Sequence, residues 1–216
     1  MEGVILGATG LIGNELLQLL LKDDRFSKVR ILVRKPTNLQ HSKLEERIID
    51  FNDNKALEAN LGTGDVLFCC IGTTMKKMKG DKEAYFKVDH DIPVHAAACA
   101  YEKGFKYYCL VSSMGANPTS NNFYLNLKGS TERGISKYPF EGIHVFRPSM
   151  LLGDRAESRP LETAGQQIMK ALSFLVPRNY KAIPAKTVAR AMINSVINEH
   201  KGWRVYENQE IFQIGG

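Results

Sequence analysis

Tyr124 and Lys128 lie four residues apart in the stretch FYLNLKG, a spacing that places two side chains on one face of a helix. A free phenol has a pKa of about 10 and is a poor acid–base catalyst at neutral pH. A neighbouring ammonium group stabilises the phenolate and lowers that pKa, and a serine hydroxyl can orient a substrate oxygen. Ser112 and Ser113 stand upstream in VSSMGAN, at the end of an apolar run. Together these residue types favour proton transfer at a carbonyl or alcohol oxygen.

A glycine-rich segment, GATGLIG at residues 7–13, separates a short apolar run from a leucine-rich stretch. Between a strand and a helix, Gly7 would permit the tight turn, Gly10 would let backbone N–H groups reach phosphate, and Gly13 would let the helix pack against the sheet. The helix N-terminus adds a partial positive charge. The spacing differs from the commoner Gly-x-Gly-x-x-Gly, and a purely structural turn is the alternative. The strand–helix context and the Tyr-Lys pair downstream favour a dinucleotide site.

The end of the second expected strand indicates which dinucleotide is bound. An NAD site usually has an acidic residue about twenty positions after the glycines, where it binds the ribose 2′-hydroxyl. Here the strand ends Val33-Arg34-Lys35, without an acid. Two cations complement a 2′-phosphate, although exposed cations at a strand end are often only solubilising. NADP(H) is therefore the expected cofactor.

Strand-like and helix-like segments alternate along the chain and must position these groups. The expected strands cover residues 4–6, 29–33, 47–51, 65–71, 106–112, 143–147 and 211–214, and the expected helices cover residues 11–22, 82–103, 124–137, 160–175 and 186–200. This alternation favours a parallel sheet covered on both faces, because parallel strands need helical crossovers. We expect an α/β fold of the Rossmann type, a doubly wound parallel sheet. Residues 1–216 would form one domain, and residues 151–216 would contribute a small substrate-side segment.

The bulk properties exclude several classes of protein. With 216 residues, 44% hydrophobic and 24% charged, the chain has an ordinary globular composition. No apolar run approaches the roughly eighteen residues of a membrane span, and the first residues do not resemble a signal peptide, so we expect a cytoplasmic protein without membrane attachment. The net charge of +6 permits an anionic ligand, but the cations are scattered, so no nucleic-acid partner is expected. The cysteines and histidines lack metal-ligand spacing, and no metal is expected.

The motifs resemble those of the short-chain dehydrogenase/reductase superfamily, in its atypical branch, and within that branch the Tat-interacting protein 2 type of NADPH-binding oxidoreductase. The resemblance spans nearly the whole chain. It rests on the segments GATGLIG, SKVRILVRK, DVLFCCIGTT, LVSSMGAN, YLNLKG and FRPSMLLGDRAESRP.

Site residues follow from this resemblance. It implies that NADP(H) is contacted by Thr9, Gly10, Leu11, Ile12, Arg34, Lys35, Ile71, Gly72, Tyr124, Lys128, Leu151 and Arg159. It also implies a catalytic set of Ser113, Tyr124 and Lys128, and the spacing in the superfamily favours Ser113 over Ser112. One position departs from the pattern. Many members carry an asparagine of the proton relay on the long fourth helix, where the stretch KVDHD offers Asp89 instead.

Two functions are consistent with these residues. The first is an NADPH-dependent oxidoreductase acting on a small carbonyl or alcohol substrate, in which Tyr124 donates the proton, Lys128 binds the nicotinamide ribose and Ser113 polarises the carbonyl. The alternative is an NADPH sensor with negligible turnover, in which the nucleotide orders a surface for a protein partner. The intact Tyr-Lys pair favours the enzyme, because a sensor has no physical need of it.

Overall fold

The computed structural model describes residues 1–152 and 180–216, and within them a single parallel sheet dominates the fold. Its seven strands follow the order β3-β2-β1-β4-β5-β6-β9, and every neighbouring pair runs parallel. The strands are β1 (Glu2–Leu6), β2 (Lys28–Val33), β3 (Leu44–Ile48), β4 (Val66–Cys69), β5 (Tyr107–Val111), β6 (Gly142–Arg147) and β9 (Gly202–Glu207). The direction of winding reverses between β1 and β4, which is where open α/β sheets bind their ligands.

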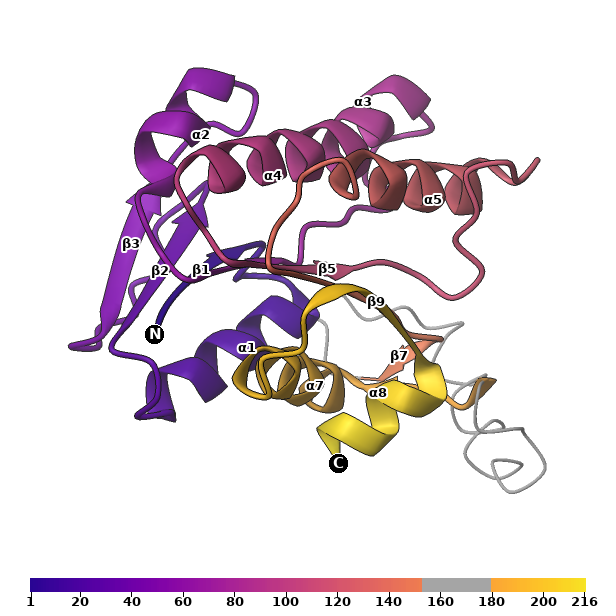
Figure 1. The fold of residues 1–216 in the computed structure, drawn as a ribbon. Coiled ribbons are helices and arrows are strands. Elements are labelled where there is room, and N and C mark those ends of the chain that lie inside the picture. Colours follow the sequence, from indigo (N-terminus) through magenta and orange to yellow (C-terminus); the bar gives the residue numbers. More distant parts are fainter. Residues whose placement is uncertain (153–179) are drawn as a thin grey trace.

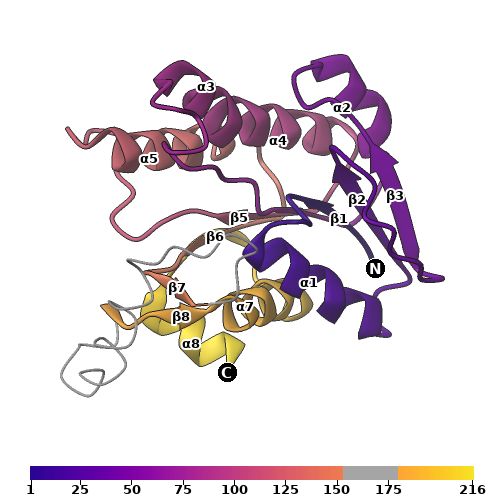
Figure 2. The ribbon, with the colours of Figure 1, turned by 180° about the vertical axis from the view of Figure 1, so that it is seen from behind.

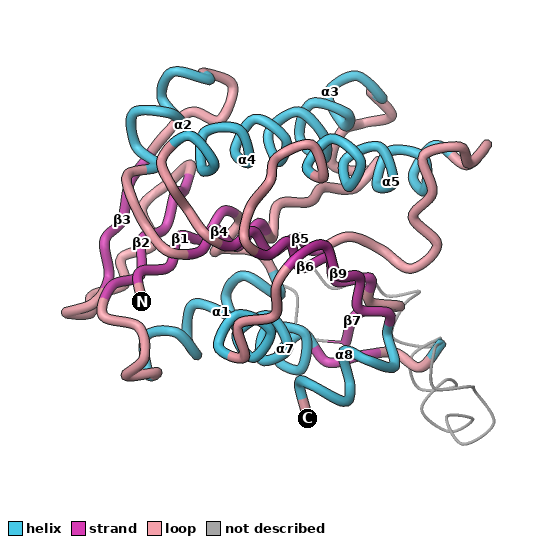
Figure 3. Tube along the Cα trace, in the orientation of Figure 1, coloured by secondary structure: helices cyan, strands magenta, loops and turns pink. Residues whose placement is uncertain are grey.

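Helices cover both faces of the sheet, as Figures 1 and 2 show from opposite sides. One face carries α1 (Leu11–Lys22), α7 (Ala185–Ile197) and α8 (Asn208–Gly215), with α7 packed against both of the others. The other face carries α2 (Asn54–Leu61), α3 (Lys82–Phe86), the π-helical turn η1 (Lys87–Asp91), α4 (Ile92–Glu102) and α5 (Phe123–Ile135). In Figure 3 the strands form a thin layer between these two helical layers. The expected doubly wound Rossmann-type fold is confirmed.

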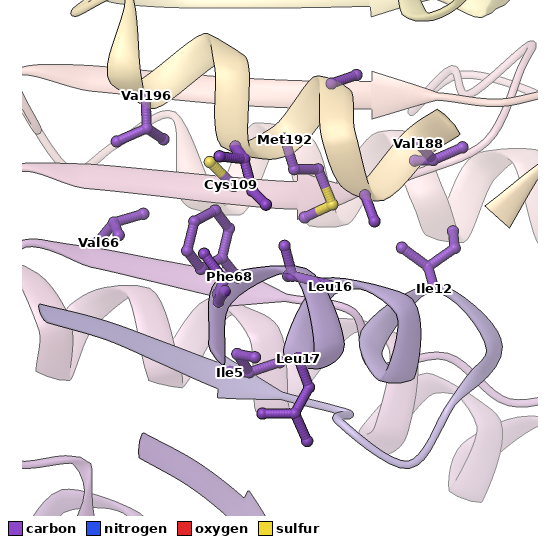
Figure 4. Packing of buried hydrophobic residues seen from close by; sticks show 14 of the residues in the cluster. Ile5, Ile12, Leu16, Leu17, Val66, Phe68, Cys109, Val188, Met192 and Val196 are labelled. Carbon is purple, nitrogen blue, oxygen red and sulfur yellow. The ribbon is translucent and has the colours of Figure 1, made fainter. Parts of the chain in front are cut away.

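Each face of the sheet has its own apolar core, because successive residues of a strand point to opposite sides. Ile5 and Phe68 pack with α1 and α7 in one cluster, as Figure 4 shows, whereas Leu6 and Leu67 belong to the cluster on the other face. All four residues of β4 are buried, which is typical of a strand covered on both sides. The carboxyl ends of β1 and β4, where the ligand site is expected, are therefore held in place by close packing on both faces of the sheet.

The expected strand at residues 211–214 is wrong, because this segment lies within helix α8. Glu207 and Glu210 form a reciprocal capping box, which stabilises the first turn of a helix over a short apolar run. The last strand is instead β9, which pairs with β6 and forms one edge of the sheet. The C-terminal residues thus extend the sheet and cover one of its faces.

Two further elements differ from expectation. The third strand is β3 at Leu44–Ile48, because its register is set by pairing with β2 (Val29 beside Leu44) and not by its apolar content. The expected long helix at 82–103 is interrupted by η1 between α3 and α4. The expected helix at 160–175 lies outside the described residues. Among the helices that are described, none has the length and apolar content needed to cross a bilayer.

Candidate functional site

Glycine is needed for a different structural reason at each of the three positions in the β1–α1 turn. Gly7 has a φ of +83°, and a Cβ there would lie 2.7 Å from the carbonyl carbon of Cys70, the residue after β4. A Cβ on Gly13 would lie 2.1 Å from the carbonyl oxygen of Gly7, so Gly13 packs the helix against the turn itself. Gly10 is exposed, and a Cβ there would come no closer to protein than 3.2 Å from the Gly7 oxygen. Gly7 and Gly13 thus build the turn, while Gly10 keeps open the space outside it.

The N-terminus of α1 begins at this turn. Gly10 is its N-cap and makes no side-chain hydrogen bond to the helix, so the first backbone N–H groups point outward without a cap. The side chain of Ile12 is buried in the core, which leaves only its backbone for a ligand, and Leu11 is partly buried. This is the arrangement by which helix N-termini bind phosphate.

A cleft of about 730 Å³ lies beside the turn, between α1 and the segment that follows β2. It is lined by Ala8, Thr9, Asn14, Leu17, Gln18, Arg34, Lys35, Pro36, Thr37 and Leu39. Thr9, Arg34 and Lys35 were expected here, whereas Asn14 and Gln18 were not. The signal for both was present in the sequence, because they stand four residues apart on the helix that starts at Leu11 and so share one face. The cleft combines two cations with amide groups.

Gly72 connects this end of the sheet with the expected catalytic residues. It follows β4 together with Ile71, beside the glycine turn. A Cβ on Gly72 would lie 3.6 Å from Asp89 Oδ1 and 3.9 Å from Lys128 Nζ. The glycine turn, the end of β4 and Lys128 therefore line one continuous stretch along the carboxyl edge of the sheet.

Asp89 and Lys128 form a buried ion pair with an N–O distance of 2.8 Å. Their relative exposures are 1% and 7%. The other carboxylate oxygen of Asp89 accepts a hydrogen bond of 2.8 Å from the backbone N–H of Thr73, and Thr131 Oγ1 donates to the Asp89 carbonyl. Burial alone would lower the pKa of Lys128, but the charge and hydrogen bond of Asp89 and the interaction with Tyr124 together outweigh burial and raise that pKa above its ordinary value. Lys128 is thus an ammonium ion at neutral pH.

The π-helical turn η1 carries Asp89. Such turns insert one extra residue into a helix and are frequent at functional sites. Asp89 is the one buried residue of η1. Its carboxylate points away from solvent toward the loop after β4. No spacing rule in the sequence links Asp89 to Lys128, although the KVDHD stretch had drawn attention to this position.

Tyr124 stands in the first turn of α5, one turn before Lys128, and is 38% exposed. The side chain of Asn122 caps the helix by accepting a hydrogen bond of 3.2 Å from the N–H of Leu125. Gly129 lets the preceding loop pack directly against the helix, because a Cβ there would lie 2.2 Å from the backbone nitrogen of Pro118. Tyr124 thus has a defined backbone position with its side chain in contact with solvent.

The two adjacent serines have different environments. Ser112 is buried and donates a hydrogen bond of 2.5 Å to Glu132, which also forms an ion pair of 2.6 Å with Arg147. Ser113 is partly buried, and its hydroxyl makes a longer contact of 3.4 Å with the carbonyl oxygen of Met114. The hydroxyl of Ser112 is therefore engaged in the protein interior, and that of Ser113 is the one available to a ligand.

Of two further expected cofactor contacts, Leu151 and Arg159, only Leu151 lies within the described residues. Leu151 belongs to the short strand β7 (Leu151–Leu152), which pairs with β8 (Ile183–Pro184), and it packs against the core that contains α1 and α7. Arg159 lies outside the described residues. Their role as cofactor contacts stays a prediction.

Comparison with known sequences gives a consistent result. Residues 7–138 match the family model described as NAD(P)H-binding. The chain is 34% identical over 215 residues to Protein HTATIP2 of Rattus norvegicus, covering 98% of this chain and 88% of that protein. It is 35% identical over 161 residues to Protein FMP52, mitochondrial, of Saccharomyces cerevisiae, covering 74% and 69%. Because the name of the yeast relative places it in mitochondria, the cytoplasmic location of this chain stays a prediction.

Solved structures with the same fold share little sequence. The Bordetella bronchiseptica enzyme WbmH in complex with NAD+ superimposes with a TM-score of 0.74 at 17% identity, over 95% of this chain and 75% of that one. MoeE5 in complex with UDP-glucuronic acid and NAD gives a TM-score of 0.76 at 16% identity, over 96% and 76%. These likenesses establish the fold. The family match and the full-length relative together show that the chain belongs to the NAD(P)H-binding family, as an atypical short-chain dehydrogenase/reductase of the HTATIP2 type.

Proposed function

We propose that the protein is an NADPH-dependent oxidoreductase that reduces a carbonyl or oxidises an alcohol. The observation that carries this proposal is the buried Asp89–Lys128 pair, which holds an ammonium ion one helical turn from Tyr124 and beside Gly72. A buried charge is costly unless it is paired, and here the paired charge lies beside Gly72 in the loop after β4.

The residues present fit NADP(H). Arg34 and Lys35 line the cleft at the end of β2 and would complement a 2′-phosphate. The space outside Gly10, which a side chain would fill, suits a pyrophosphate at the N-terminus of α1. Lys128 would bind the nicotinamide ribose. When bound, the nicotinamide supplies a hydride to a carbonyl carbon or accepts one from an alcohol carbon.

The chain's own groups would handle the proton and the orientation of substrate. Ser113 would donate a hydrogen bond to the substrate oxygen, since the hydroxyl of Ser112 is already bound to Glu132. Tyr124 would transfer its phenolic proton to that oxygen, assisted by the positive charge of Lys128. Because Tyr124 contacts solvent, water can return the proton after turnover. That residues 151–216 contribute the substrate side is part of this proposal; of these residues, 180–216 build β8, α7, β9 and α8.

The variant Tyr124→Phe tests the proposal, with Tyr101→Phe as a matched control on the exposed surface of α4. NADPH oxidation is measured against a panel of aldehydes, ketones and quinones, and NADPH affinity is followed separately by cofactor fluorescence. We expect turnover to fall by about 10² or more in Tyr124→Phe, the usual scale for losing a general acid, with nearly unchanged NADPH affinity. Equal rates in Tyr124→Phe and the control would exclude the tyrosine from the chemistry. Tight NADPH binding without turnover on any carbonyl compound would favour the NADPH sensor.

A further inference from the structure

Helices α2 and α4 bring three potential metal ligands together on the face of the sheet opposite α1. His95 and Cys99 stand four residues apart on α4, and Glu58 comes from α2. The ligand atoms of all three residues lie within 4.8 Å of one another. Figures 1 and 2 both show α2 beside the end of α4 that is remote from α3. The histidines and cysteines show no metal-ligand spacing in the sequence, because the third ligand is supplied only by the packing of the two helices.

Two of the three separations between these atoms match those in a tetrahedral zinc site, and the third, between Glu58 and Cys99, is within 4.8 Å. His95 Nε2 lies 3.5 Å from Cys99 Sγ and 3.6 Å from Glu58 Oε1. Zinc binds imidazole nitrogen at about 2.0–2.1 Å, thiolate sulfur at about 2.3 Å and carboxylate oxygen at about 2.0–2.2 Å. With tetrahedral angles, two such ligands stand roughly 3.3–3.6 Å apart. His95 Nε2 therefore already has the right distance to both other ligands.

The chemistry of the three groups also suits zinc. A thiolate and a carboxylate balance the two positive charges of the ion, and the neutral imidazole completes a borderline-soft set that calcium or magnesium would not favour. The side chains of Glu58 and His95 are 54% and 25% exposed, so an ion can enter from solvent. Cys99 is buried behind them at 3% exposure. We propose that Glu58, His95 and Cys99 form a zinc site that joins α2 to α4, with water as the fourth ligand.

Metal binding must displace a proton from Cys99. Burial raises the pKa of this thiol to about 11, and the carboxylates of Glu58 and Glu102 add to the effect. The metal-free thiol is therefore protonated at neutral pH. Zinc forms the Zn–S bond as the S–H proton leaves to solvent, so one proton is released per ion and affinity rises with pH. His95 Nε2 also gives up its 3.4 Å contact with the carbonyl oxygen of Asn54.

The site is separate from the dinucleotide cleft, which is lined by α1 and the segment after β2. Its expected effect is on stability, because an ion bound only by the folded chain raises the melting temperature. At a free zinc concentration 100-fold above Kd, a chain of this length is expected to gain about 5 to 10 °C in Tm.

The experiment uses the untagged full-length protein, stripped with a chelator and kept reduced. Zinc is titrated in competition with a chromophoric chelator, Co²⁺ is added to look for the thiolate-to-cobalt charge-transfer band, and Tm is recorded with and without zinc. The test variants are Glu58→Gln, His95→Gln and Cys99→Ser. Glu83→Gln on α3 and His90→Gln on η1 serve as controls that keep all three ligands.

We expect one zinc ion per chain, a charge-transfer band with Co²⁺, and a loss of affinity of about 10- to 100-fold or more in each test variant, with the controls unchanged. Glu58→Gln alters an exposed side chain and His95→Gln a partly exposed one, so both report on binding even where Cys99→Ser folds poorly. The proposal is overturned if the unmodified protein leaves the zinc with the chelator, if Co²⁺ gives no thiolate band, or if His95→Gln binds zinc as tightly as His90→Gln.

Discussion

The variant Asp89→Asn isolates the electrostatic role of the buried pair. Asparagine has nearly the same size and keeps an oxygen that can accept the hydrogen bond from Thr73, so the main change is the loss of the negative charge beside Lys128. Removing one partner of a buried ion pair costs about 3 to 5 kcal/mol. We expect about 3 kcal/mol of lost unfolding free energy at pH 7, the low end, because the hydrogen bonds are retained.

Release of the proton from Lys128 sets an upper limit on this loss of unfolding free energy. Without Asp89, desolvation lowers the pKa of the buried lysine, and the folded variant can release the proton instead of burying a bare charge. For a free lysine with a pKa of about 10.4, releasing that proton costs about 4.6 kcal/mol at pH 7 but only about 1.2 kcal/mol at pH 9.5. In the unmodified protein the pKa of Lys128 is raised, so its contribution is fully present below about pH 10 and is lost as pH rises further.

The difference in stability between the two proteins must therefore narrow from about 3 kcal/mol at pH 7 to about 1 kcal/mol at pH 9.5. Urea unfolding followed by far-UV circular dichroism measures it at both pH values, with Asp91→Asn, an exposed neighbour, as the control. A loss of the same size at both pH values would show that shape and not charge is responsible. A loss below about 1 kcal/mol at pH 7 would refute the pairing itself.

Three further outcomes are expected. Replacing both Arg34 and Lys35 with alanine should weaken NADPH binding by about tenfold to hundredfold and leave NADH binding unchanged in calorimetry, because only NADPH carries the 2′-phosphate; equal affinities of the unmodified protein for both nucleotides would contradict this. Gly10→Val should abolish NADPH binding with a normal circular dichroism spectrum, whereas Gly13→Val should disrupt the fold, since its Cβ would lie 2.1 Å from a backbone oxygen; normal NADPH binding by Gly10→Val would be inconsistent with a phosphate at this position. Burial lowers the pKa of His144 to about 4, so the free energy of unfolding should fall by about 3 kcal/mol as pH drops from about 6.5 to about 4. Urea unfolding at several pH values should show that the free energy of unfolding of His144→Gln depends less steeply on pH in this range.

The sequence predicted the parts of the fold that local pattern controls. The glycine turn, the buried run of β4 and the helix that carries Tyr124 and Lys128 each depend on residues close in the chain, and the structure contains all three elements. The C-terminal segment was misread because IFQI is a short apolar run that strands and helices share. Here a capping box at Glu207 decides for the helix.

The site was predictable only where one motif contained it. The face shared by Tyr124 and Lys128 follows from their spacing, whereas the partner of Lys128 does not, because Asp89 reaches it through a π-helical turn on another element. The choice between Ser112 and Ser113 likewise depends on Glu132, which becomes a neighbour of Ser112 only when α5 packs on the sheet. Long-range pairing of buried charges is not encoded in periodicity.

The unequal burial of Tyr124 and Lys128 has an evolutionary consequence. Tyr124 is exposed, so exchanging it removes a hydroxyl and leaves the interior intact. Lys128 cannot be replaced in the same way, because its loss leaves the carboxylate of Asp89 buried without a positive partner. If Tyr124 has the proposed catalytic role, we expect descendants without that activity to lose the tyrosine first and to keep the lysine and aspartate together. On the proposed function, a single exposed substitution converts the enzyme into a nucleotide-binding scaffold, with no intermediate that folds poorly.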